Sequence, residues 1–180
     1  MEMLGIVLVV IVVLIGWFIS TSNTLNRAIV KMDESKSGVE IQLKRRYDIL
    51  TQSFNVAKGY MKHEESVFAN LRAVNSGMSV AEMNETIDNQ GKAISGLMAL
   101  AESYPELRSE ELFSNLQNQL SEENAQLAAA KRALNANITK INNLVVSFPS
   151  SIVCSMKGQG KEEFLKEENK EAIKDINLTF

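Results

Sequence analysis

The feature that most constrains the fold of this chain is an unbroken apolar segment at its beginning, Leu4 to Ile19. Thirteen of these sixteen residues are Leu, Ile, Val or Phe, and after Glu2 the next charged side chain is Arg27. A helix of about 17 to 20 residues covers roughly 26 to 30 Å, which is the apolar thickness of a bilayer. Insertion is favoured by roughly 4 to 8 kcal/mol. The sequence therefore predicts a transmembrane anchor over residues 1–25.

Two other interpretations of this segment were weighed. A cleaved secretory signal carries a basic start, a shorter apolar core and a small-residue cleavage site, whereas this chain has Glu2 at its start and a long core. A buried helix of a soluble protein would need apolar partners on all its faces, and the remaining helices are too polar to supply them. A membrane span is the favoured interpretation.

The basic residues nearest to the span predict its orientation. Arg27, Lys31 and Lys36 follow it, and only the α-amino group precedes it. Because short basic flanks stay in the cytoplasm, we expect a single-pass protein with its N-terminus outside and the following domain in the cytoplasm. Protease added to inside-out vesicles should digest that domain, and protection there would reverse the assignment.

The composition of the rest of the chain indicates one helical domain. The whole chain has two prolines, one cysteine and a net charge of −3. A charge of this sign and size gives no indication of nucleic acid as a partner. One cysteine rules out an intrachain disulfide and a cysteine-based zinc cluster.

Apolar residues recur at steps of three, four and seven, which is the period of amphipathic helices. The pattern predicts helices over Asn26–Val74, Val80–Ser103 and Glu110–Ser147, with a short helix through Ile152 to Met156. The expected buried stripes are Ile29, Met32, Val39, Leu43, Tyr47, Leu50, Phe54, Ala57, Met61, Phe68, Leu71 and Val74; Val80, Met83, Ile87, Ile94, Leu97, Ala101 and Tyr104; Phe113, Leu116, Leu120, Leu127, Ala130, Leu134, Ile138, Ile141 and Val145.

Local signals refine these helices. Ser79 with Glu82 forms a capping-box pattern, and Ser109 and Ser150 are further candidate N-caps. We expect Gly38 and Gly59 to weaken the first helix without breaking it, since neither has a proline or a loop cluster beside it.

Short connections between helices place them antiparallel to one another. We therefore expect an all-α fold, an N-terminal transmembrane helix followed by an elongated antiparallel three-to-four-helix bundle. The domains would be 1–25 as the anchor, 26–157 as the bundle and 158–180 as a charged tail, and the last ten residues would be either mobile or strapped along the bundle. The second helix is about half as long as the first, so the first and third must pair alone over part of their length, which favours self-association.

The search for chemistry yields no candidate catalytic, cofactor-binding or metal-binding residue. His63 is the only histidine, and Tyr60 stands where a di-iron bundle would need a glutamate. Cys154 lies between Val153 and Ser155 and is expected to pack as a small apolar residue. We therefore expect a protein that is not an enzyme.

One basic cluster, Lys44, Arg45 and Arg46, could bind lipid, but it would lie roughly 35 to 40 Å from the bilayer, several Debye lengths away. Ion pairs of Lys44 with Glu40 and Asp48 are the favoured explanation, and a contact between protomers remains an alternative. The third helix carries many neutral amides, most of which should face solvent.

Four stretches carry a resemblance to a known family: Val39–Asp48, Ala57–Glu64, Glu102–Leu107 and Ser147–Ile152. Their order and spacing, together with the N-terminal span, are similar to those of the LemA family of bacterial membrane proteins. The resemblance implies a single-pass helical protein of the bacterial inner membrane. It implies no catalytic residues.

Taken with the absence of a site, these features predict a non-enzymatic, membrane-anchored helical scaffold that self-associates into a homo-oligomer at the bilayer. The alternative is a membrane-tethered binding module that docks a protease, a kinase or a transporter. An enzyme or metal protein is the least favoured class, and no cofactor is expected.

Overall fold

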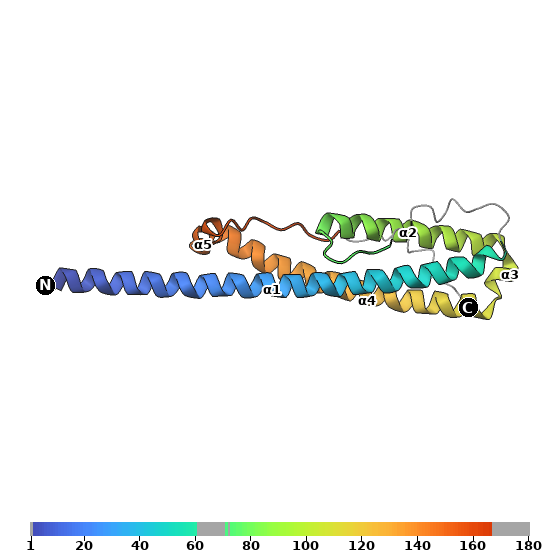
Figure 1. Cartoon of the computed structure of the whole chain (residues 1–180), viewed down its shortest axis with the longest axis horizontal. Helices are drawn as coiled ribbons and strands as arrows, with labels where there is room; N and C mark the ends of the chain where they lie inside the picture. Colours follow the sequence, from blue (N-terminus) through green and yellow to red (C-terminus); the bar gives the residue numbers. More distant parts are fainter. Residues whose placement is uncertain (1, 61–70, 72, 167–180) are drawn as a thin grey trace. The chain divides into compact units, whose positions relative to one another are not determined.

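The structure is a computed structural model that describes residues 2–60, 71 and 73–166. The regular elements in these residues are all helices, which confirms the all-α prediction: α1 (Glu2–Lys58), α2 (Val80–Ser103), α3 (Pro105–Arg108), α4 (Glu111–Val146) and α5 (Ser150–Met156) (Figure 1). The chain forms two compact units. The first unit consists of residues 1–35 and 133–164, and the second unit of residues 36–132 and 165–180.

The second unit is a three-helix bundle closed by the single turn of α3. Its helices are the later part of α1, all of α2 and the earlier part of α4. In this unit α2 runs in the same direction as α1, and only α4 runs back, so the prediction of antiparallel neighbours is wrong for α1 and α2 (Figure 1). The reason is that twenty-one residues lie between Lys58 and Val80 in place of a short connection.

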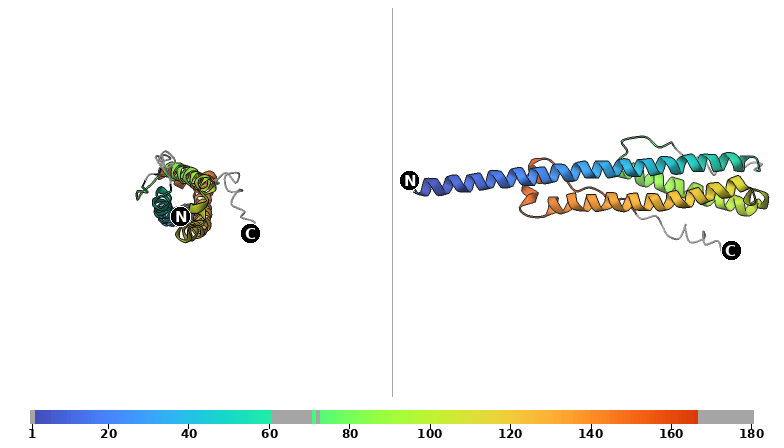
Figure 2. Two further views of the ribbon diagram at one scale, coloured as in Figure 1. Left: turned by 90° about the vertical axis from the view of Figure 1, so that its right-hand side faces the viewer. Right: turned by 90° about the horizontal axis from the view of Figure 1, so that it is seen from below.

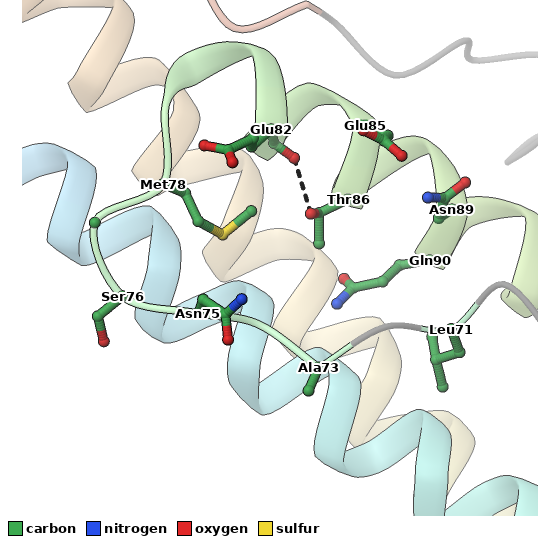
Figure 3. A pocket seen from close by; sticks show the side chains of 11 residues that line it. Leu71, Ala73, Asn75, Ser76, Met78, Glu82, Glu85, Thr86, Asn89 and Gln90 are labelled. Atoms are coloured by element: carbon green, nitrogen blue, oxygen red, sulfur yellow. Dashed lines mark hydrogen bonds between the residues drawn. The ribbon is translucent and has the colours of Figure 1, made fainter.

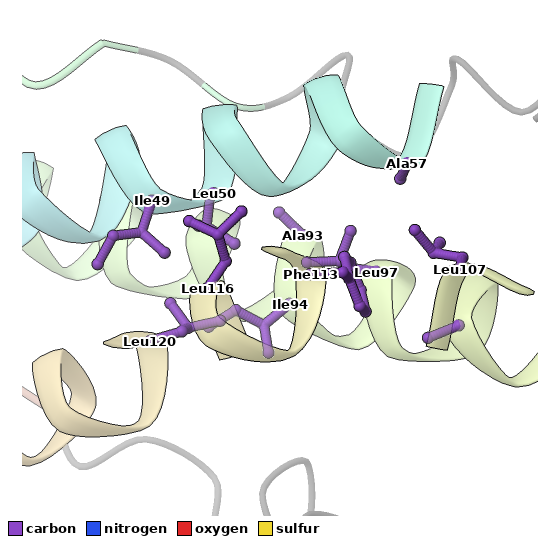
Figure 4. Packing of buried hydrophobic residues seen from close by; sticks show 11 residues of the cluster. Ile49, Leu50, Ala57, Ala93, Ile94, Leu97, Leu107, Phe113, Leu116 and Leu120 are labelled. Atoms are coloured by element: carbon purple, nitrogen blue, oxygen red, sulfur yellow. The ribbon is translucent and has the colours of Figure 1, made fainter. Parts of the chain in front are cut away.

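The apolar stripes of these three helices meet in one core (Figure 4), whose members are Ile49, Leu50, Ala57, Ala93, Ile94, Leu97, Ala101, Leu107, Phe113, Leu116 and Leu120. Every described residue of the second predicted stripe is buried or half-buried, so the periodicity of α2 is confirmed.

The first unit holds the start of α1, the end of α4 and α5, which lie beside one another in Figures 1 and 2. Along α1, the residues from Met3 to Gly16 are all exposed, Trp17 and Phe18 are half-buried, and Leu25 is the first fully buried side chain. From α5, Val153 and Cys154 are buried. No residue of α2 belongs to this unit, as the unequal helix lengths predicted.

The first predicted helix differs from the observed one at its end. Gly38 lies within α1, as expected, but α1 ends at Lys58, directly before Gly59. The prediction that Gly59 would weaken the helix without ending it is wrong. The helix ends where a tertiary contact forms: the Tyr60 hydroxyl donates a hydrogen bond to the carboxylate of Glu110, directly before α4, at 3.1 Å, and a glycine gives up helix at low cost. Met61 and Phe68 of the predicted stripe lie outside the described residues.

Of the N-caps predicted for α2 and α4, the first is confirmed and the second is wrong. Ser79 caps α2 with the complete capping box: its hydroxyl accepts from the Glu82 amide at 3.2 Å, and the Glu82 carboxylate accepts from the Ser79 amide at 2.7 Å. Ser109 does not cap α4. Pro105 starts the one-turn helix α3 where only a connection was expected, and the Ser109 hydroxyl donates to the Glu106 carbonyl at the end of that turn.

Ser150 is likewise not a cap but the first residue of α5. Its hydroxyl donates back to the carbonyls of Leu144 and Ser147, and the cap position is held by Pro149. The side chain therefore fastens α5 to the end of α4 instead of satisfying an amide of α5.

The chain after α5 is held by specific contacts as far as it is described. Asn142 on α4 donates to the Glu162 carbonyl at 2.9 Å and accepts from the Glu162 amide at 2.8 Å. Leu165 is buried, and the Lys166 amide donates to the Asn84 side chain at 2.9 Å. We call this described segment, residues 158–166, the strap. The last ten residues, for which a mobile or a strapped tail is predicted, lie outside the described residues.

Candidate functional site

Polar side chains are buried on each of the three helices of the second unit. Gln90 of α2 is 1 % exposed, and its amide nitrogen donates to the Leu43 carbonyl of α1 at 2.9 Å. Arg46 and Lys131, on α1 and α4, are buried too, at 2 % and 8 % exposed. Buried amides and charges cost free energy unless they are paired, so the bond from Gln90 to Leu43 favours one register of α2 on α1 over others.

The three residues of the basic cluster, Lys44, Arg45 and Arg46, differ in exposure. Lys44 and Arg45 are exposed, whereas Arg46 points into the bundle. Arg45 forms an ion pair with Glu123 of α4 at 3.8 Å, and Glu40 accepts a hydrogen bond from the Met78 amide at 2.8 Å. Glu40 was expected to pair with Lys44 on the same helix. Instead, its carboxylate accepts a hydrogen bond from the loop before α2.

A groove of the second unit lies between that loop and α2 (Figure 3), with a volume of about 210 Å³. One wall is the chain from Asn75 to Met78, and the α2 wall presents Glu82, Glu85 and Gln90. The Glu82 carboxylate is engaged in the capping box, and the amide and hydroxyl of Ser79 hold its pKa below the usual range. The groove can accept hydrogen-bond donors, but the residues that line it pair no nucleophile with a base.

A second groove lies in the first unit, with a volume of about 460 Å³, between α1, the end of α4 and the start of α5. Three cations line it: Arg27 and Lys31 from α1 and Lys140 from α4. Leu144 and Ser147 supply part of the α4 wall. We call it the basic groove, because these three cationic side chains line it.

The other residues weighed in the sequence give no reaction centre. Cys154 is buried, as predicted, and burial raises the pKa of its thiol, which makes it a poor nucleophile. His63 lies outside the described residues. Within the described residues, no three His, Cys, Asp or Glu side chains gather closely enough to hold a metal ion.

From the sequence, Arg27 and Lys31 are predicted only to set the orientation of the span, and no role is predicted for Lys140. Arg27 and Lys31 are four residues apart, about one helical turn, so the sequence alone predicts that they share one face of α1. The approach of Lys140 is set by the pairing of α4 with α1 and has no local signal.

The fold defines a class: an all-α protein with an apolar N-terminal helix and an amphipathic bundle. Comparison with known proteins makes the assignment narrower. The sequence profile of the LemA family matches residues 35–180, so the chain belongs to the LemA family. A search of curated proteins finds no significant match.

Proposed function

We propose that this protein is a non-enzymatic scaffold that is anchored in the bacterial inner membrane by the start of α1 and self-associates there. One observation carries the anchoring: α1 contains an 18-residue window with a mean hydropathy of 2.9, none of whose residues is fully buried by the rest of the described chain. Apolar surface on this scale is costly in water, and a bilayer removes that cost.

Continuity with the folded domain supports an anchor over a cleaved leader. The apolar segment is part of the first unit, and α1 continues from it without a break. Trp17 and Phe18 are already half-buried in that unit, and Leu25 is fully buried. A cut near the end of the segment would remove side chains that the domain covers.

Self-association is supported by apolar side chains that the described residues leave uncovered. Val30 on the α1 segment of the first unit is more than half exposed, and so are Ile41 and Leu112 in the second unit. Isolated apolar residues on a surface are ordinary, but these lie on long helices suited to side-by-side packing with another copy.

The test is size-exclusion chromatography with light scattering on the full chain in mild detergent. The proposal expects a discrete homo-oligomer, and it expects Val30→Gln with Ile41→Gln to shift the particle toward smaller species. Lys44→Gln, on an exposed position of the same helix, serves as the matched control and should leave the particle unchanged. A strictly monomeric wild-type particle would refute self-association.

The alternative function is a membrane-tethered module that docks a protease, a kinase or a transporter. The groove lined by Glu85 and its neighbours favours it, because its acceptors are open to a donor-rich segment of a partner. In that case the purified full chain would be monomeric and would carry one stoichiometric foreign protein, whereas the scaffold predicts copies of this chain alone.

A further inference from the structure

The corner between α4 and α5 exposes an unusual amount of apolar surface. α4 ends at Val146, and α5 begins at Ser150. Within eleven residues, four large apolar side chains are exposed: Val146 (55 %), Phe148 (82 %), Ile152 (49 %) and Met156 (71 %). The opposite side of α5 is buried in the first unit through Val153 and Cys154. The corner thus carries apolar side chains on its exposed side as well as on the side that packs in the first unit.

This corner lies beside α1 where the apolar segment ends. Lys157, directly after α5, donates a hydrogen bond to the Asn26 side chain at 2.8 Å, and both residues belong to the first unit. Asn26 is seven residues past Ile19, or roughly 10 Å along the helix. A bilayer's headgroup layer adds about 5 to 8 Å beyond its apolar core on each side. The uncharged segment continues through Ser22, and the 19 residues from Leu4 to Ser22 cover roughly 28 Å, enough to fill that core. Asn26 then lies four residues, or roughly 6 Å, beyond the core, which holds α5 at the level of the headgroups.

The charges around the corner suit the same environment. Arg27, Lys31 and Lys140 line the basic groove, which reaches the corner through Ser147 and Ser150. In an α-helix the Cα–Cβ bonds lean toward the N-terminus, so Arg27 and Lys31 lean toward the apolar segment. Long cationic side chains next to apolar residues commonly reach lipid phosphates at the membrane interface.

We propose that the α4–α5 corner is a second membrane contact, in which Val146, Phe148, Ile152 and Met156 enter the interface of the bilayer and the basic groove binds the phosphates of anionic lipids. The inference rests on the anchoring proposed above. Bilayer lipid is favoured over another protein as the occupant because the apolar face and the cations lie in the same unit as the apolar segment and at its end.

The test places an environment-sensitive nitrobenzoxadiazole label on Phe148→Cys in the full chain, reconstituted in nanodiscs of phosphatidylcholine and phosphatidylglycerol. Cys154 can stay, because it is buried, and the unmodified chain supplies the labelling blank. Ala136→Cys, exposed on α4 of the first unit and twelve residues before Phe148, is the matched control. Lipids brominated near the headgroup end of their chains are one quencher, and aqueous iodide is the other.

The proposal expects bromolipids to quench the label at Phe148 and iodide to leave it bright, with the reverse at Ala136. A third label on Val10→Cys separates the two proposals. If deep bromolipids quench Val10 while iodide quenches Phe148, the anchor stands and the corner contact is refuted. If Val10 is not quenched by lipid, the anchoring itself fails. If the Phe148 label is shielded from iodide without lipid quenching, protein covers the corner and the inference is wrong.

A separate experiment tests whether the basic groove binds anionic lipid. Purified full chain should retain phosphatidylglycerol, measured by lipid mass spectrometry, and Lys31→Gln with Lys140→Gln should lose most of it. Arg132→Gln removes an exposed cation from the second unit and should retain lipid as the unmodified chain does. Equal lipid content in all three proteins would contradict a role for the basic groove.

Discussion

At the scale of single residues, the start of α2 is the best-defined local structure in the chain. Ser79 and Glu82 exchange hydrogen bonds with each other's backbone amides, and the Ser79 hydroxyl also donates to the Glu82 carboxylate at 2.7 Å. These bonds satisfy two of the amides that every helix start leaves open. Because α2 supplies one of the three helices of the second unit, the cap contributes to the stability of that whole bundle.

Replacing the cap should therefore destabilise the bundle. We expect Ser79→Ala to lower the free energy of unfolding by about 1 kcal/mol, measured by urea denaturation of the full chain in detergent. Ser95→Ala is the matched control, because Ser95 lies inside α2, is exposed, and its hydroxyl donates only to the Gly91 carbonyl one turn earlier. Equal losses in the two variants would show that the capping box contributes nothing.

The same pair predicts a pH dependence. The Ser79 amide and hydroxyl hold the pKa of Glu82 below its ordinary value of 4.5. A carboxyl with a depressed folded-state pKa stabilises the fold above its ordinary pKa, and that contribution is lost as the pH falls through the depressed value. The stability difference between the wild type and Glu82→Gln, followed by circular dichroism, should thus shrink on acidification below 4.5. A difference that is constant with pH would exclude this linkage.

Cys154 offers a direct probe of packing in the first unit. Its thiol is buried, and burial raises its pKa, so the reactive thiolate is scarce at neutral pH. Ellman's reagent should react slowly with the folded chain and promptly in urea. Ser155→Cys places an exposed thiol one position later and should react promptly in both conditions. Prompt reaction of Cys154 in the folded protein would contradict the packing of α5.

At the scale of elements, the end of α5 shows how one glycine fixes a boundary. Gly158 has a φ of 69°, its amide donates to the Ser155 carbonyl at 3.1 Å, and the Gln159 amide donates to the Cys154 carbonyl at 2.9 Å. This is the Schellman arrangement, which requires a residue in the left-handed region. It turns the chain from α5 into the strap that contacts Asn142.

Gly158→Ala should consequently destabilise the first unit. A left-handed conformation costs a non-glycine residue roughly 1 to 2 kcal/mol, so we expect a lower midpoint in thermal unfolding followed by circular dichroism. Gly160→Ala is the control, since Gly160 has no positive φ and open space around its Cα. If both variants melt together with the wild type, the turn does not limit stability.

The elements that sequence predicted best are those with the strongest period. α2 and α4 were predicted almost to their ends because their stripes repeat without interruption. Gly38 and Gly59 have the same intrinsic helix propensity, so propensity could not predict that only Gly59 follows the end of α1. The difference depends on a tertiary contact, the hydrogen bond between Tyr60 and Glu110, which are fifty residues apart. α3 was missed because a helix of one turn is too short for a helical period to repeat.

The candidate sites were predictable in part. Arg46 lies three residues after Leu43 and four before Leu50, and Gln90 lies between Ile87 and Ile94, so both occupy buried stripes and could have been assigned to the core. The position of Lys140 in the basic groove depends on which turn of α4 meets α1. That register is fixed by tertiary packing and leaves no trace in local sequence.

At the scale of the whole molecule, the chain combines two surfaces that suit different surroundings. The residues from Met3 to Gly16 are apolar or uncharged and exposed, whereas the second unit buries its apolar stripes in a core of its own. A single helix, α1, contributes to both. The account of a membrane scaffold depends on the first of these surfaces lying in lipid.

Flotation of membranes after an alkaline carbonate wash tests this claim most directly, with intact mass spectrometry confirming that residues 1–25 are retained. The account predicts that the full chain floats with the lipid, and that Val10→Asp with Leu14→Asp moves the folded protein into the aqueous fraction. An intact wild-type chain that remains in the aqueous fraction would contradict it.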